Sequence, residues 1–144
     1  MLYQVAACIG PDLIAALHRM GHGDEIVLAD AFFPGESVNP RVLRADGVRM
    51  ADLLDGVLRL INLDEYADPF LMMAPVTGDT SDPGVEAGYR AVAERRWPTP
   101  PTVFLERFAF YERARRAFCV VMTGETAKYG NLILKKGVIP LETR

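Results

Sequence analysis

Apolar residues along the chain follow two spacings, and these spacings predict where helices and strands lie. Between Pro11 and Gly21 they recur every three or four residues, as on one face of a helix. Glu25–Ala29 is instead a short, nearly continuous apolar run, typical of a buried strand. The same reading predicts helices over Pro11–Met20, Met50–Ile61, Pro83–Arg96 and Phe108–Ala117, and strands over Glu25–Ala29, Arg41–Ala45, Phe70–Ala74, Thr102–Leu105, Phe118–Thr123 and Asn131–Leu134. Because strands alternate with helices, we expect an α/β fold with three layers, helices on both faces of the sheet and ligands at the carboxyl ends of strands.

The length and composition fit one domain spanning residues 1–144. Half of the 144 residues are hydrophobic and 24% are charged, which is enough apolar material for a core. The formal net charge of -3 argues against binding to nucleic acid or to an anionic membrane. The mean hydropathy of +0.09 is high for so short a chain. It indicates apolar surface buried between subunits, and a monomer with a rich core is the alternative.

Several classes of protein are disfavoured by what the sequence lacks. The apolar runs fall far short of the roughly 20 residues that a membrane-spanning helix needs. The first ten residues contain no Lys or Arg, which a secretory signal carries at its start. Cys8 and Cys119 belong to no C-x-x-C motif, and we expect both to be reduced and buried in a cytoplasmic protein. Glycine-rich nucleotide-binding motifs are missing as well.

The two histidines are candidates for proton transfer or metal binding. His22 stands in Gly21-His22-Gly23-Asp24, where the flanking glycines let the backbone expose the imidazole. An imidazole gives and accepts protons near neutral pH, so His22 is a candidate acid–base residue, although an ordinary helix-ending turn explains it equally well. His18 and His22 are four residues apart, as in helical metal sites, but Gly21 interrupts the predicted helix between them. We therefore expect no metal and assign His18 to the surface or to an interface.

Polar residues beside the predicted strands are candidates for a binding site. Asp30 ends a buried apolar run, where open α/β sheets place groups that contact ligands. Arg107 comes at the start of a predicted helix, where the helix dipole disfavours a positive charge and a separate role is indicated. Tyr129, Gly130 and Asn131 bring a phenol, a flexible backbone and an amide together before the last strand. Taken singly, each has a plainer explanation as a cap, an ion-pair partner or a turn residue.

Five segments, taken in order, resemble a known family. They are MGHGDEIVLADAFFP (20–34), RADG (44–47), GDTSDP (78–83), RFAFYERARRAF (107–118) and TGETAKYGNLILKKGV (123–138). Together they resemble the L-fucose mutarotase branch of the fucose mutarotase and D-ribose pyranase family, over Pro11–Val138. Each segment alone is unspecific, whereas the ordered set is highly specific.

The resemblance implies the fold of this family and an enzyme activity. It implies an isomerase that interconverts the α and β anomers of a free sugar, L-fucose, without a cofactor or a metal. It also implies that His22 is the catalytic proton donor, and that Asp30, Arg107, Tyr129, Gly130 and Asn131 bind the sugar. Members of the family form ring-shaped homo-oligomers, commonly decamers, with sites near subunit contacts. We therefore expect this chain to associate with itself.

Several questions stay open at this point. Phe32 stands where relatives of the fucose branch often have His or Asn, so it either changes the sugar preference or stacks against a pyranose face. A D-ribose pyranase would share His22, a non-catalytic sugar-binding module would keep the pocket, and a metal-dependent hydrolase is a third alternative. In the mechanism, Asp24 is a candidate to orient the imidazole, and Tyr129 or Asp30 is a candidate for the second proton transfer.

Overall fold

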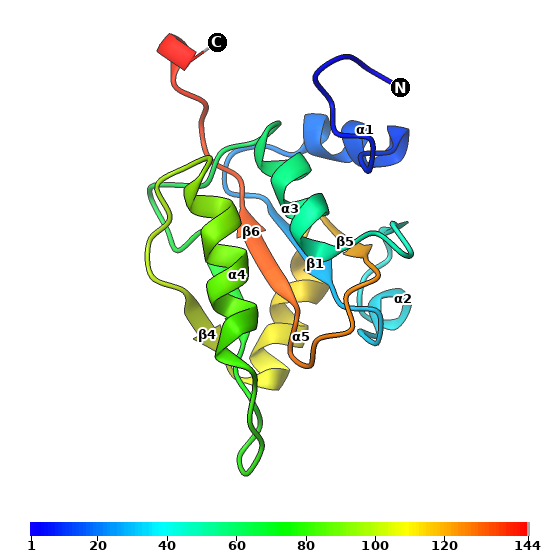
Figure 1. Cartoon of the computed structure of the whole chain (residues 1–144), viewed down its shortest axis with the longest axis vertical. Coiled ribbons are helices and arrows are strands. Elements are labelled where there is room, and N and C mark those ends of the chain that lie inside the picture. Colours follow the sequence, from blue (N-terminus) through cyan, green and yellow to red (C-terminus); the bar gives the residue numbers. More distant parts are fainter. Residues whose placement is uncertain (144) are drawn as a thin grey trace.

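The computed structural model describes residues 1–143 and has a six-stranded sheet at its centre (Figure 1). The strands are β1 (Glu25–Ala29), β2 (Val42–Arg44), β3 (Phe70–Met73), β4 (Val103–Leu105), β5 (Cys119–Met122) and β6 (Leu132–Lys135). They lie side by side in the order β2-β5-β1-β6-β3-β4. Within the described residues, β6 alone runs antiparallel to its neighbours, and the other pairs are parallel.

Helices cover both faces of this sheet, which confirms the predicted α/β fold. They are α1 (Pro11–Arg19), α2 (Gly35–Val38), α3 (Met50–Leu58), α4 (Pro83–Glu94) and α5 (Arg107–Arg116), followed by the 3-10 turn η1 (Leu141–Thr143). Each predicted helix and strand is present, with ends that differ by a few residues. The sequence did not predict α2 and η1, because segments of 4 and 3 residues are too short to show a helical period.

The sheet is buried on both sides by two separate apolar clusters. In β1, Ile26 and Leu28 pack in the cluster formed with α1, α3 and α4. Val27 and Ala29 point the other way and pack in the cluster formed with α2 and α5. Side chains of a strand alternate between the two faces of a sheet, so both sets must be apolar when both faces are covered. This explains the continuous apolar run in the sequence.

The helix α5 begins one residue before the predicted start, because Glu106 caps it. The Glu106 carboxylate accepts the amide hydrogens of Phe108 and Ala109 at 3.0 and 3.1 Å. A carboxylate at this position accepts hydrogen bonds from free N–H groups, and its negative charge interacts favourably with the positive end of the helix dipole. It therefore offsets the unfavourable position of Arg107 in the first turn.

The direction of the strands decides which loops meet. Asp30 directly follows β1, and Asn131 directly precedes β6, so the antiparallel pairing brings both to one end of the sheet. His22 precedes β1 and therefore lies toward the opposite end. The five residues of β1 span about 16 Å at the usual rise of a strand. Figure 1 shows the two ends of β1 pointing to opposite sides of the molecule.

Two minor expectations can be compared with the structure. Both cysteines are free, and Cys119 is buried as expected. Cys8 is only partly buried, because it lies in the loop before α1 and packs at the edge of the core, where its thiol points to the carbonyl of Asp52 at 3.5 Å. No helix within residues 1–143 has the length and the apolar character that crossing a bilayer needs.

Candidate active site

A pocket of about 250 Å³ opens at the end of the sheet where β1, β3 and β4 finish. Its polar lining residues are Asp30, Arg107, Tyr111, Lys128, Tyr129 and Asn131. Its apolar lining residues are Phe32, Phe33, Pro34, Met73 and Val76. The volume lies below the usual range for drug-sized ligands and suits a small, polar molecule. Four of the five residues expected to bind a sugar therefore meet in one pocket.

Asp30 and Asn131 form the buried base of this pocket. The amide nitrogen of Asp30 donates to Asn131 Oδ1 at 2.8 Å, and Asp30 Oδ1 accepts from the amide of Phe32 at 3.0 Å. Both side chains are almost fully buried. Burial raises the pKa of the Asp30 carboxyl above its ordinary value, although hydrogen bonds from nearby backbone amides oppose the shift. A raised pKa moves a carboxyl toward the range useful for proton transfer.

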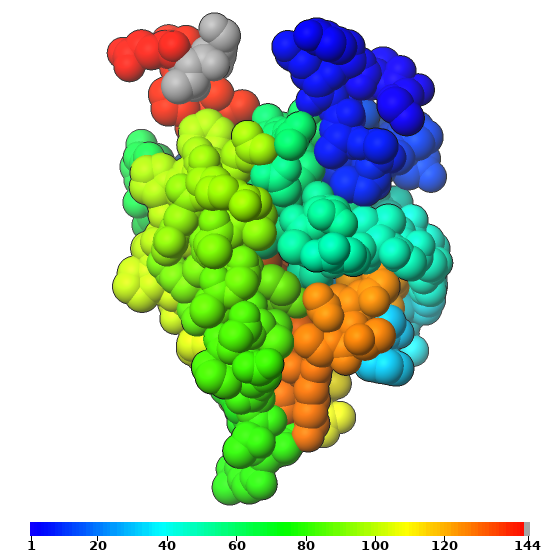
Figure 2. All heavy atoms as spheres, viewed as in Figure 1, coloured from blue at the N-terminus to red at the C-terminus, as the bar shows by residue number. Residues whose placement is uncertain are grey.

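Tyr129 is held by the loop that connects β3 with α4, which projects at the lower end of the molecule (Figure 2). Its hydroxyl donates to Asp79 Oδ2 at 2.6 Å and accepts from the amide of Val76 at 3.3 Å. Lys128 Nζ lies 2.6 Å from the same carboxylate oxygen. Hydrogen bonds from Lys128 and then Tyr129 lower the pKa of Asp79 to about 2. The phenol is thus fixed at the pocket by a carboxylate that the sequence analysis did not single out.

Arg107 approaches the pocket from the first turn of α5. Its Nε donates to the Tyr111 hydroxyl at 3.3 Å, and this bond is the largest cause that raises the pKa of the guanidinium. The guanidinium carbon also lies 5.5 Å from the centre of the Tyr111 ring. The two residues are four apart on a helix and therefore neighbours on its surface. That spacing was the signal that could have added Tyr111 to the predicted site.

Gly130 is buried beside the pocket, and its backbone is hydrogen-bonded to neighbouring residues of the protein. Its carbonyl accepts from the Tyr89 hydroxyl at 3.0 Å, and its amide donates to the Ala127 carbonyl at 3.1 Å. A Cβ atom at this position would lie 2.8 Å from the same Ala127 oxygen. The close approach of the backbone explains why glycine is needed here. The expectation that Gly130 binds the sugar directly stays a prediction.

His22 lies away from this pocket and is paired with a carboxylate. Its Nε2 is 2.8 Å from Asp64 Oδ1, and the Asp64 side chain is only 3% exposed, against 46% for His22. The Tyr66 ring stands edge-on to the imidazole at 5.3 Å. Asp24, the expected partner, instead accepts the amide hydrogen of Gly21 at 2.7 Å and closes the turn. The structure therefore corrects the orienting residue from Asp24 to Asp64.

The ionisation state of Asp64 decides which nitrogen of His22 carries the proton. Burial by itself raises the pKa of Asp64, but hydrogen bonds from His22 and from the amides of Tyr66 and Ala67 bring it below its ordinary value. The amide of Ala67 is 3.0 Å from Asp64 Oδ2. An ionised carboxylate only accepts hydrogen bonds, so His22 Nε2 is the nitrogen that donates to Asp64, and Nδ1 lies on the other side of the ring from this bond.

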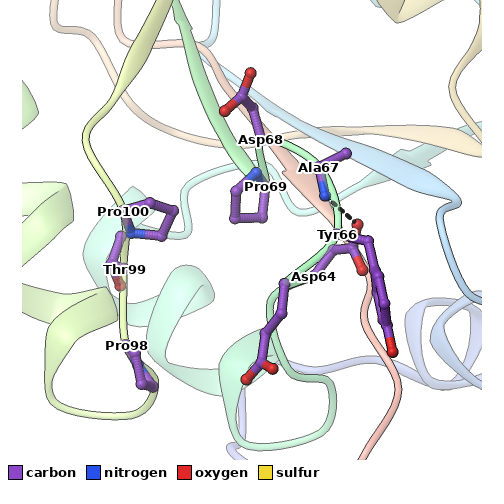
Figure 3. A pocket seen from close by; sticks show the side chains of 9 residues that line it. Asp64, Tyr66, Ala67, Asp68, Pro69, Pro98, Thr99 and Pro100 are labelled. Atoms are coloured by element: carbon purple, nitrogen blue, oxygen red, sulfur yellow. Dashed lines mark hydrogen bonds between the residues drawn. The ribbon is translucent and has the colours of Figure 1, made fainter.

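Asp64 also lines a wider hollow of about 770 Å³ (Figure 3). Figure 3 shows that the segment Asp64–Pro69 faces the segment Pro98–Pro100 across it. Tyr66, in this lining, is 83% exposed. His18 is exposed on α1, and no group of three metal-ligating side chains occurs among residues 1–143. An imidazole paired with a buried carboxylate, as His22 is with Asp64, suits proton transfer.

Comparison with known proteins places this arrangement in a family. Residues 4–139 match the model of the RbsD / FucU transport protein family. The chain belongs to this family. The match covers both the pocket and the His22–Asp64 pair, and it confirms the resemblance carried by the sequence segments.

Solved structures agree with the family assignment over nearly the whole chain. The fucose mutarotase from Streptococcus pneumoniae, in complex with L-fucose, is 44% identical with a TM-score of 0.90, and the match covers 96% of this chain and 100% of that one. FucU from Bifidobacterium longum is 40% identical with a TM-score of 0.84, over 94% and 99% of the chains. RbsD from Bacillus subtilis, complexed with D-ribose, shares the fold at 19% identity and a TM-score of 0.75, over 97% and 100%. The match to a mutarotase at 44% identity supports the isomerase class expected from the sequence.

Proposed function

We propose that this chain is an L-fucose mutarotase, which interconverts the α and β anomers of L-fucose without a cofactor or a metal. The observation that carries the proposal is the match over 96% of the chain, at 44% identity, to a fucose mutarotase bound to L-fucose. The pocket supports it independently, because buried Asp30 and Asn131 offer polar groups in a space of about 250 Å³. Carboxylate and amide groups suit the hydroxyls of a sugar.

The mechanism is ring opening, rotation of the aldehyde and ring closure. Opening requires a proton at the ring oxygen and removal of a proton from the anomeric hydroxyl, and closing reverses both steps. In this proposal His22 Nδ1 gives and takes one of these protons, since an imidazole does both near neutral pH. Tyr129 or Asp30 carries the other proton. Arg107 and Asn131 hold hydroxyls, so that the open chain stays bound while its aldehyde turns.

These roles require two copies of the chain. His22 and Asp30 flank β1, whose five residues span about 16 Å, so the imidazole of one copy is too far from the pocket of that copy. In the proposed ring-shaped homo-oligomer, a decamer, His22 of one copy completes the pocket of its neighbour. Exposed apolar side chains support a contact at both places. Tyr66 is 83% exposed beside His22, and Phe108 is 69% exposed at the start of α5.

The proposed location is the cytoplasm. Both cysteines are free thiols, which fits a reducing compartment. The whole chain, residues 1–144, acts in this proposal as one mutarotase domain.

Saturation-transfer NMR on the anomeric protons tests the proposal. Saturating the α-anomer signal of L-fucose should reduce the β-anomer signal in the presence of the protein and much less in buffer. His22→Ala should remove the acceleration, since a positioned acid–base residue contributes about 100- to 10,000-fold. A protein that binds L-fucose without exchanging its anomers would be a sugar-binding module. D-ribose in the same assay tests the alternative pyranase activity, and acceleration confined to D-ribose would overturn the fucose assignment.

A further inference from the structure

The sugar pocket contains an apolar corner that the proposed chemistry does not use. Of its apolar lining residues, Phe33 and Met73 are almost fully buried, with 6% and 5% exposure. Phe32 is 76% exposed and Val76 is 39% exposed. These two side chains therefore offer free apolar surface to a molecule in the pocket.

The backbone of both residues is anchored to polar side chains of the pocket. The amide of Phe32 donates to Asp30 Oδ1 at 3.0 Å, and the amide of Val76 donates to the Tyr129 hydroxyl at 3.3 Å. The apolar corner is thus held in a fixed relation to the groups that would bind hydroxyls. Neither side chain has a hydrogen-bond donor or acceptor of its own.

In the pyranose forms of L-fucose, D-arabinose and L-galactose, carbons 1 to 4 carry hydroxyls in the same configuration at carbons 2 to 4, and only the substituent on carbon 5 differs. We propose that Phe32 and Val76 receive this substituent, so that the pocket selects sugars whose carbon 5 bears a methyl group. This inference rests on the proposed function and adds the residues that decide specificity. The polar lining takes the hydroxyls, and the methyl group lies against the phenyl ring and the valine methyls.

The expected selectivity follows from two simple comparisons. Burying one extra methyl group favours binding by about fourfold over a hydrogen atom, at the usual value per carbon. A hydroxyl added to that methyl finds no partner in the corner and is disfavoured by about 10- to 100-fold, the usual limit for an apolar pocket.

Three sugars isolate this position. L-fucose, D-arabinose and L-galactose share the configuration of carbons 2 to 4 and carry methyl, hydrogen and hydroxymethyl on carbon 5 of the pyranose. The experiment measures kcat/KM for anomer exchange and Kd by NMR titration for all three. Wild-type protein should prefer L-fucose about fourfold over D-arabinose and at least tenfold over L-galactose.

Variants assign the selectivity to the apolar corner. Phe32→Asn supplies a polar group and should reduce the preference of L-fucose over L-galactose at least fivefold. Val76→Thr exchanges a methyl for a hydroxyl with little change in shape, and it should reduce the same preference. It keeps the test available if Phe32→Asn does not fold. Phe104→Ala is the matched control, because Phe104 is 51% exposed on β4 and outside the pocket lining. It should leave both ratios unchanged.

Two results would overturn the inference. In the first, the variants lower the constants for all three sugars by the same factor, as a ring stacked on the pyranose face or a subunit contact would do. In the second, wild-type protein binds L-galactose as tightly as L-fucose. If no sugar shows faster anomer exchange, the proposed function fails, while the Kd ratios still decide whether the corner selects a methyl group.

Discussion

Replacing Asp64 with Asn tests whether a buried carboxylate prepares His22 for proton transfer. The change keeps the shape of the side chain and removes its charge. Hydrogen bonds to charged groups contribute about 1.5–3 kcal/mol, and the 46% exposure of His22 reduces this value. Asn can still accept from the amide of Ala67, which is 3.0 Å from Asp64 Oδ2. We therefore expect the free energy of unfolding to fall by about 1–2 kcal/mol.

The effect of Asp64→Asn on anomer exchange should be larger than this loss of stability suggests. Without the carboxylate, His22 is no longer held with its proton on Nε2, and a misplaced catalytic group can cost about 100-fold. We expect kcat for L-fucose exchange to fall 10- to 100-fold, with KM little changed. Nitrogen chemical shifts of the His22 ring, measured by NMR, should show a larger share of the other tautomer.

The matched control for this variant is Glu65→Gln. Glu65 is exposed in the same loop, so the substitution removes the same charge without touching the imidazole. It should leave both the rate and the ring shifts as in the wild type. The reasoning is refuted if Asp64→Asn exchanges anomers at the wild-type rate, or if Glu65→Gln slows exchange equally.

Three further substitutions test the pocket. Asn131→Leu leaves the buried amide of Asp30 without its acceptor, so urea denaturation should show a loss of about 1–3 kcal/mol and NMR a strong loss of exchange. Gly130→Ala places a Cβ 2.8 Å from a backbone oxygen and should cost about 1–3 kcal/mol, whereas Gly88→Ala, in open space within α4, should stabilise by up to about 1 kcal/mol. Asp79 has a folded pKa of about 2, below its ordinary 3.8, so its contribution is present above pH 4 and is lost as the pH falls toward 2. Wild-type protein should therefore lose stability more steeply than Asp79→Asn across that interval.

For each of these three predictions, a specific result would contradict the reasoning. Asn131→Leu with wild-type stability would mean that water replaces the lost acceptor. A stable Gly130→Ala protein would mean that the turn before β6 adjusts to the new methyl group. Parallel stability curves for wild type and Asp79→Asn between pH 4 and pH 2 would show that the contacts of Asp79 contribute nothing to folding.

The sequence predicted the longer helices and all six strands, but it did not predict the order in which the strands pair. The apolar run of β1 predicted a strand buried on both faces, because such a strand carries apolar residues at every position. The antiparallel position of β6 between β1 and β3 leaves no local pattern, since strand order depends on long-range pairing. That position is what brings Asn131 beside Asp30.

The candidate site shows the same limit. Asp30, Arg107, Tyr129 and Asn131 could be predicted, because they stand at strand ends and lie in segments that resemble the family. Asp64 could not, since it is 42 residues from His22 and no motif joins them. The separation of His22 from Asp30 could be predicted, because the two residues stand before and after the same predicted strand, Glu25–Ala29.

The central claim is that His22 of one copy completes the sugar pocket of another, and mixed oligomers test it most directly. His22→Ala and Asn131→Leu are co-expressed with different tags, purified through both tags and assayed by saturation-transfer NMR on L-fucose. Each variant alone should be inactive. With random pairing, about a quarter of the sites in the mixed oligomer have both wild-type residues, so about a quarter of the wild-type rate should return. A mixed oligomer as inactive as its two parents would contradict a site shared between copies.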